Sequence, residues 1–192
     1  MALRPAFDAL FDLDEALADI VARSTEPALG AIKLAWWRDQ LAGLEQGVPA
    51  EPRLRAVAAE LLPRGAMGAT LAELTDGWAA LFEESPEIER IGEGGAKLFA
   101  LAASLLKADD PLIETAGRLY RQGQVARRGL SAAHWPTDEL SRLAGHRFAK
   151  AARPLSALAV LAHRDVRRGS DEPEATPGRS WALIRHRMTG RV

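Results

Sequence analysis

The chain has 192 residues, of which 47% are hydrophobic, which is the size and composition of one globular domain with a real core. The absence of cysteine excludes a disulfide framework, a thiolate zinc site and a cysteine nucleophile, and it fits a cytosolic protein. The net charge of −1 hides two halves of opposite sign, because residues 1–114 carry ten basic and twenty acidic side chains, whereas residues 115–192 carry fifteen and six.

The spacing of the apolar residues predicts the first helix over residues 7–22. Its buried stripe recurs at steps of three and four residues and consists of Leu10, Leu13, Leu17 and Ile20. The carboxylates that point away from this stripe form a solvated acidic face: Asp8, Asp12, Glu15 and Asp19. The alternative for this face is a metal site at the i,i+4 pair Asp8 and Asp12. Asp14 lies on the flank of the stripe, so we expect it to be partly buried, either beside an arginine of a neighbouring helix or in a functional role.

The second predicted helix begins near residue 27 and ends near residue 47. Its core stripe consists of Leu34, Trp37, Leu41 and Leu44. Trp36 is about 100° around the helix from Trp37, so it either lines a cavity wall or packs beside Trp37. Arg38 and Lys33 flank the two tryptophans, and either of them is a candidate to meet Asp14.

Further helices are predicted over residues 52–62, 71–82 and 96–107, and the glycine-rich segment 92–97 is interpreted as the start of the last of these. A helix over residues 116–129 follows, in a stretch (115–136) that contains no acidic residue. Three arginines of this helix share one face with Val125: Arg118, Arg121 and Arg128. Because guanidinium groups match phosphate geometry, this face predicts binding of an anionic ligand such as a diphosphate.

The last helices are expected over residues 137–150, from Pro154 onward, and over residues 180–190, with residues 164–179 as an exposed loop. The final helix has an apolar edge, Trp181, Ile184 and Met188, beside the basic residues 185–187. Such an edge either docks on the helix's own bundle, which we favour for so short a segment, or lies on a membrane surface. The predicted fold is all-α, a single bundle of about eight helices over residues 1–192.

Several partner and location classes are excluded or favoured by these patterns. The longest apolar run, residues 98–106, is far shorter than the roughly 20 residues that span a bilayer, so we expect no transmembrane segment. No zinc-finger spacing or RNA-binding signature accompanies the basic half, so we expect no nucleic-acid partner. We expect a cytoplasmic protein, peripheral on a membrane at most, whose basic half either packs on the acidic half or binds an anionic partner.

The order of the first two helices resembles the start of a squalene/phytoene synthase-family protein. In that family an Asp-Asp-Ile-Val-Asp motif precedes a helix in which a basic residue, a Trp and a Leu follow one another at one-turn steps. Lys33, Trp37 and Leu41 stand at such positions, whereas only the middle Asp of the motif, Asp19, remains. The resemblance covers residues 7 to about 130 and is closest to a divergent branch with eroded aspartate motifs, which includes a eukaryotic mitochondrial assembly factor of respiratory complex I.

The resemblance implies an isoprenoid-synthase-like bundle, in which active members use two aspartate motifs to hold Mg²⁺ against a leaving diphosphate. This chain places arginine where the second motif belongs, so we expect that catalysis by this route is lost and that no cofactor or metal is bound. The expected function is a degenerate binding or assembly factor for a prenyl diphosphate, an anionic lipid or a protein partner, with ligand-binding residues Trp36, Arg38, Arg118, Arg121 and Arg128. The alternatives are an active prenyl transferase whose Mg²⁺ is held by remote carboxylates, with Asp14 and Asp19 as the catalytic candidates, and a scaffold module with a closed cavity.

Overall fold

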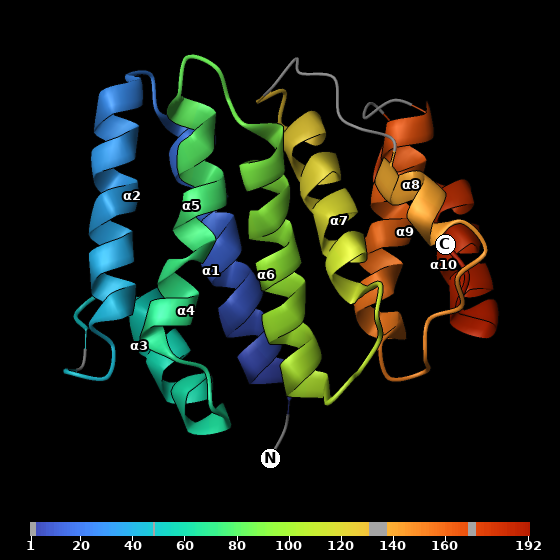
Figure 1. The fold of residues 1–192 in the computed structure, drawn as a ribbon, viewed down its shortest axis with the longest axis horizontal. Helices are drawn as coiled ribbons and strands as arrows, with labels where there is room; N and C mark the ends of the chain where they lie inside the picture. Colours follow the sequence, from blue (N-terminus) through green and yellow to red (C-terminus); the bar gives the residue numbers. More distant parts are fainter. Residues whose placement is uncertain (1–2, 48, 131–137, 169–171) are drawn as a thin grey trace. The chain divides into compact units, whose positions relative to one another are not determined.

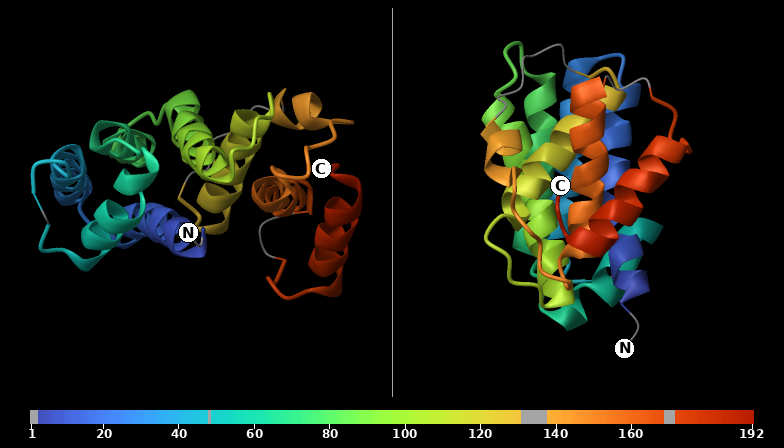
Figure 2. Two further views of the ribbon diagram at one scale, coloured as in Figure 1. Left: turned by 90° about the horizontal axis from the view of Figure 1, so that it is seen from below. Right: turned by 90° about the vertical axis from the view of Figure 1, so that its right-hand side faces the viewer.

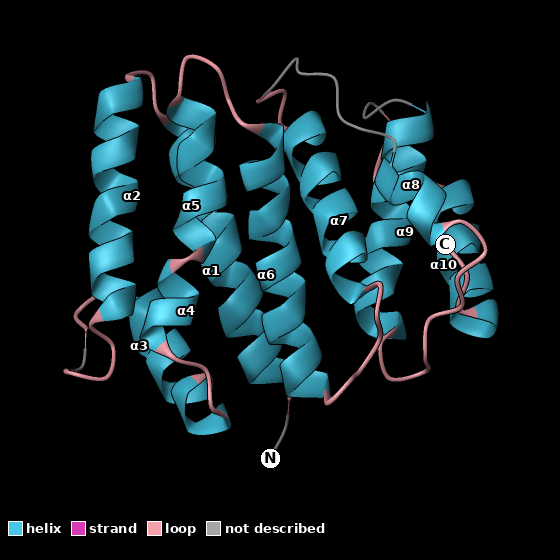
Figure 3. Cartoon of the chain, in the orientation of Figure 1, coloured by secondary structure: helices cyan, strands magenta, loops and turns pink. Residues whose placement is uncertain are grey.

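The computed structural model describes residues 3–47, 49–130, 138–168 and 172–192, and the described residues form helices and loops without a strand (Figures 1 and 3). The predicted all-α class is therefore confirmed for this part of the chain. The helices divide into two compact units, Met1–Gly94 and Gly95–Val192, and the division falls within α6 (Ile88–Leu106). The single domain over residues 1–192 stays a prediction. None of the described helices is both long enough and apolar enough to cross a membrane.

The first unit is built on α1 (Arg4–Arg23). The three leucines of its predicted stripe are fully buried, whereas Ile20, the fourth member, is half-buried. Three helices contact α1: α2 (Pro27–Ala42), α3 (Pro52–Glu60) and α5 (Leu74–Ala79). The helix α4 (Gly68–Ala72) packs on α2, and two 3₁₀ turns, Leu62–Arg64 and Ala80–Phe82, join the remaining elements. Proline stands in the first turn of α1, α2 and α3, where its missing N–H costs no helical hydrogen bond and its fixed φ suits the helix.

Two sequence predictions differ from the structure in this unit. The helix predicted over residues 71–82 is divided into α4, α5 and the turn Ala80–Phe82. The glycine-rich segment 92–97 does not start a helix, because α6 already begins at Ile88. Its glycines serve helix contact instead, since a Cβ on Gly77 of α5 would lie 3.0 Å from the Cα of Gly94 in α6.

The second unit contains the rest of α6 together with α7 (Ile113–Arg127), α8 (Asp138–Leu143), α9 (Arg153–Arg168) and α10 (Pro177–Thr189). The helices α7 and α9 pack against each other over an extensive contact. The two helices approach closely at Gly123, where a Cβ would lie 2.8 Å from the Cβ of Ala162. The last helix, α10, lies against α9 (Figure 2).

The exposed loop predicted over residues 164–179 is wrong at both ends. The helix α9 continues to Arg168, and α10 begins at Pro177. The sequence contained a signal for the second boundary, because Thr176 followed by Pro177 is a typical helix N-cap and first residue. The Thr176 hydroxyl accepts a hydrogen bond from the Arg179 N–H at 3.3 Å, which satisfies one of the backbone donors in the first turn.

Candidate functional site

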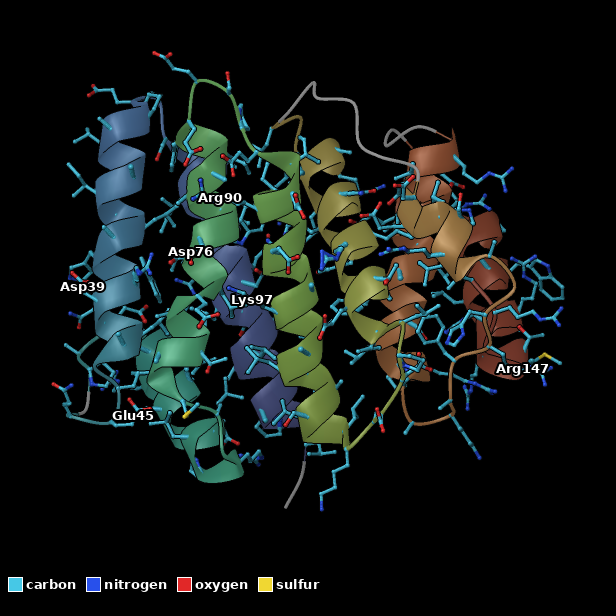
Figure 4. The ribbon with its side chains drawn as sticks, viewed as in Figure 1. Asp39, Glu45, Asp76, Arg90, Lys97 and Arg147 are labelled. Carbon is cyan, nitrogen blue, oxygen red and sulfur yellow. The ribbon has the colours of Figure 1, made fainter. Side chains whose placement is uncertain are left out.

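Asp14 is buried in the first unit, as its position on α1 predicts. The indole N–H of Trp78, on α5, donates a hydrogen bond to Asp14 Oδ1 at 2.9 Å. Sequence reasoning did not identify Trp78 as a partner of Asp14 and so missed this polar contact. The arginine expected beside Asp14 from α2 lies elsewhere, because Arg38 pairs with Asp76 at 2.6 Å (Figure 4 labels Asp76).

Asp19, the other catalytic candidate, lies in a different environment from Asp14. Its carboxylate pairs with Arg23, one turn along α1, at 3.0 Å. It also lines a surface pocket of about 320 Å³ together with Lys33, Trp37 and Arg53. The structure therefore does not bring the two candidate carboxylates together, and in the part of the chain that it describes no group of three His, Cys, Asp or Glu side chains is placed to hold a metal ion.

Trp36 lies on the outer side of α2, with 46% of its surface exposed, and its ring meets the edge of Trp37 with centroids 5.7 Å apart. Trp37 itself is buried, as predicted. Leu29 and Ile32 are exposed on the same side of α2 as Trp36. Trp36 thus belongs to an outward-facing apolar stripe on this helix.

The arginines predicted to form an anion-binding face on α7 are largely interior. Arg121 is fully buried, and Arg118 and Arg128 are half-buried. One guanidinium N–H of Arg128 donates to the backbone carbonyl of Gln124 at 3.4 Å, one turn back along α7. The open cationic surface of the second unit lies on α9 and α10 instead.

The helix α10 is inverted relative to an ordinary surface helix. Its outer side carries the three large apolar side chains of the predicted edge, with exposed fractions of 65% for Trp181, 49% for Ile184 and 75% for Met188. Its inner side carries two polar side chains, Arg179 and His186, which are both buried. The helix does dock on its own unit, as we favoured from the sequence, but it uses the polar side rather than the apolar edge. We call the three apolar residues the outer face of α10.

The inner side of α10 is held by polar contacts with α9, one of which also involves α7. Arg179 forms an ion pair with Asp165 of α9, and Arg127 of α7 approaches the same carboxylate oxygen at 3.2 Å. The ring of His186 lies 2.9 Å from the hydroxyl of Ser156 through Nε2. Buried charges and imidazoles require such partners, and here the partners fix which side of α10 faces inward.

Cations flank the outer face on both sides. Arg185 and Arg187 are exposed, and no carboxylate pairs with either of them within the described ranges. Arg147 and Arg191, which form an isolated backbone bridge, are also exposed near the end of α10 (Figure 4 labels Arg147). An apolar strip between arginines is the pattern of a helix that lies at a membrane interface.

Two pockets adjoin α10. The first has a volume of about 480 Å³ between α9 and α10, and its lining includes His163, Arg167, Trp181 and Arg185. Burial, followed by the charges of Arg167 and Arg185, lowers the pKa of His163. The second pocket, of about 460 Å³, borders the opposite flank of α10 and is mostly apolar, with Leu183 among its lining residues.

No family model, curated protein or solved structure matches the chain. The resemblance of residues 7 to about 130 to the squalene/phytoene synthase family therefore stays a prediction.

Proposed function

We propose that the chain is a peripheral membrane-binding protein whose second unit docks on anionic lipid through the outer face of α10. The inversion of α10 is the observation that carries this proposal. A single exposed apolar side chain is normal on a protein surface, but three of them in register on one helix, above buried polar residues, are not. The arrangement stabilises the helix against α9 and leaves its apolar side available to a second, non-aqueous surface.

The magnitude of apolar transfer supports binding of this kind. Covering the exposed parts of Ile184 and Met188 contributes about 1–2 kcal/mol each, scaled from about 1.5–3 kcal/mol for a whole buried side chain. The whole Trp181 side chain has roughly 200 Å² of surface, of which 65% is exposed, so covering the exposed part at 25 cal/mol per Å² contributes about 3 kcal/mol. The outer face thus contributes at most about 7 kcal/mol to insertion.

The charges favour an anionic lipid surface over an apolar protein surface. Arginines on both sides of the outer face add about 1 kcal/mol each next to negatively charged head groups. They would resist burial in an uncharged protein interface, because a guanidinium that loses water there needs a new partner. We therefore infer a lipid surface as the occupant, with Arg185 and Arg187 at head-group depth.

The same proposal fits the resemblance to a degenerate squalene/phytoene synthase-family protein that binds a lipid ligand or helps an assembly at a membrane. A binding role is supported by the eroded aspartate motif around Asp19. We do not propose the Mg²⁺-dependent prenyl transferase, because Asp14 contacts Trp78 inside the first unit while Asp19 pairs with Arg23 at its surface.

Vesicle co-sedimentation tests the proposal with an internally matched control. The wild-type chain should bind vesicles of phosphatidylcholine with 30 mol% phosphatidylserine, less so as salt rises, and should bind pure phosphatidylcholine weakly. Replacing Trp181, Ile184 and Met188 together by Ser should abolish sedimentation. The control is the triple Ser variant of Leu29, Ile32 and Trp36, whose exposed apolar residues have the same spacing on α2.

The α2 variant should sediment like the wild type. Equal loss of binding in both triple variants would show general hydrophobic adhesion and overturn the proposal. Failure of the wild-type chain to bind phosphatidylserine vesicles at low salt would overturn it as well. Circular dichroism of each variant checks that the helices are intact, so that lost binding is not lost folding.

A further inference from the structure

The pocket between α9 and α10 combines cationic side chains with direct access to the outer face of α10. Arg167 and His163 come from α9, whereas Arg185 and Trp181 come from α10. Trp181 belongs both to the pocket lining and to the outer face, so a molecule in the pocket would lie beside the apolar strip. The volume of about 480 Å³ is within the range of roughly 300–1,000 Å³ for small-molecule sites.

One wall of the pocket is fixed by a structural ion pair. The Arg164 guanidinium binds both carboxylate oxygens of Glu172, at 2.5 and 2.7 Å, and Thr176 donates to the same carboxylate at 2.8 Å. In this pairing the charges of Arg164 and Glu172 neutralise each other, and the contacts connect the last turns of α9 with the start of α10. Gly178 leaves room for it, because a Cβ there would overlap the Arg164 guanidinium.

Within the described segments, the remaining cations of the pocket pair with no carboxylate side chain. Arg167 and Arg185 are both exposed, and within the described segments neither pairs with a carboxylate. Their charges act together on His163, which is half-buried and lines the same pocket. Two guanidinium groups and an imidazole around one pocket provide a positive potential that an anion would neutralise.

We propose that this pocket binds a phosphate monoester, which in the docked protein is the head group of a lipid. A phosphate monoester carries a charge of about −1.5 to −2 at pH 7, which matches two arginines better than the single charge of a phosphodiester. Arginine also pairs with phosphate oxygens through two parallel hydrogen bonds, which gives the site geometric as well as electrostatic preference. The lipid form of this inference rests on the proposed membrane docking, since Trp181 then anchors the apolar part of the same molecule.

The imidazole of His163 provides a local readout that does not depend on vesicles. A bound phosphate monoester offsets the charges of Arg167 and Arg185, so the pKa of His163 should rise when glycerol 3-phosphate is added to the full chain. Nuclear magnetic resonance of the four histidine rings follows this titration, with His163→Gln used to assign the signal. Arg167→Ala should weaken glycerol 3-phosphate binding at least tenfold, whereas Arg142→Ala, an exposed arginine of α8 outside the pocket, should leave it unchanged.

Vesicles then distinguish a lipid head group from a soluble phosphate. At matched surface charge, the wild-type chain should bind phosphatidic acid vesicles at least threefold more tightly than phosphatidylserine vesicles, and Arg167→Ala should remove this preference. A response of His163 to glycerol 3-phosphate without any vesicle binding would support the pocket, with a soluble phosphate monoester as its ligand, and overturn the docking. Vesicle binding without preference, and with no response of His163, would overturn the pocket alone. Absence of both effects would overturn both proposals.

Discussion

Replacing Asp165 by Asn should strongly destabilise the second unit, because this carboxylate holds the inner side of α10. Its side chain is only 3% exposed, and it faces Arg179, which is 7% exposed, and Arg127, which is 23% exposed. The substitution keeps the size of the side chain but leaves two guanidinium groups facing a neutral amide. Removal of one partner from a buried ion pair costs about 3–5 kcal/mol, because the other charge remains without compensation.

A loss of this size is measurable by thermal and urea denaturation. For a chain of about this length, 1 kcal/mol shifts Tm by about 2–4 °C, so Asp165→Asn should lower Tm by roughly 10 °C. The matched control is Asp8→Asn, which removes a carboxylate that pairs with Arg4 at 3.6 Å on the open surface of α1. That substitution should change the free energy of unfolding by less than about 0.5 kcal/mol.

A double substitution separates buried charge from lost packing. Asp165→Asn combined with Arg179→Met should recover much of the stability that Asp165→Asn loses, because apolar groups of similar volume often replace a buried ion pair at little cost. Loss of less than 1 kcal/mol in Asp165→Asn would refute the reasoning. The same holds if the two substitutions destabilise the protein additively, since additivity means that the two side chains do not interact.

The pH dependence of stability and the close contact of α6 with α7 give two further predictions. The pKa of His163, lowered by burial and by Arg167 and Arg185, means that the unfolded chain binds the proton more readily. The free energy of unfolding should therefore fall as the pH drops below about 6.5, the ordinary pKa of histidine, and His163→Gln should flatten this part of a urea-denaturation series. Gly117→Ala should destabilise the protein by about 3 kcal/mol in the same assay, because its Cβ would overlap the carbonyl oxygen of Gly95 and leave the two backbones no room.

Each of these predictions has its own control. Gly47→Ala tests the glycine argument, since no atom lies within 4 Å of the added Cβ and the cost should be small. Equal effects of the two Gly→Ala substitutions would contradict the assigned role of close backbone contact. An unchanged acid limb of the pH series in His163→Gln would show that other groups account for the acid sensitivity.

Local periodicity predicted the individual helices well where one face is plainly apolar. The helix predicted over residues 7–22 is α1, and the burial of Asp14 followed from its place beside the leucine stripe. Helix boundaries differ from the prediction where glycine or charge interrupted the pattern. Gly94 and Gly95 lie inside α6, where neighbouring helices approach so closely that a side chain would not fit. The sequence does not reveal which glycines have such contacts.

The candidate site depended on contacts between residues far apart in the chain. The sequence identified the apolar edge of the last helix and its neighbouring arginines, but it assigned Asp165 and Arg179 to an exposed loop. Their pairing, with Arg127 as a third member, makes the polar side of α10 the buried one. The arginines of α7 differ from the prediction in the opposite direction. The sequence predicted an anion-binding face there, but that face includes Arg121, which is fully buried.

The sequence alone determined the all-helical class, most of the helices and the residues that share a face on each one. These properties follow from the 3.6-residue period and from local turn chemistry, which act over a few neighbouring residues. Only the tertiary structure decided which face of α10 points inward, because that depends on whether Arg179 and His186 find buried partners on α9. The free energy gained from the contacts of Arg179 and His186 exceeds the free-energy cost of exposing Trp181 to water. No periodic pattern within the helix predicts those contacts.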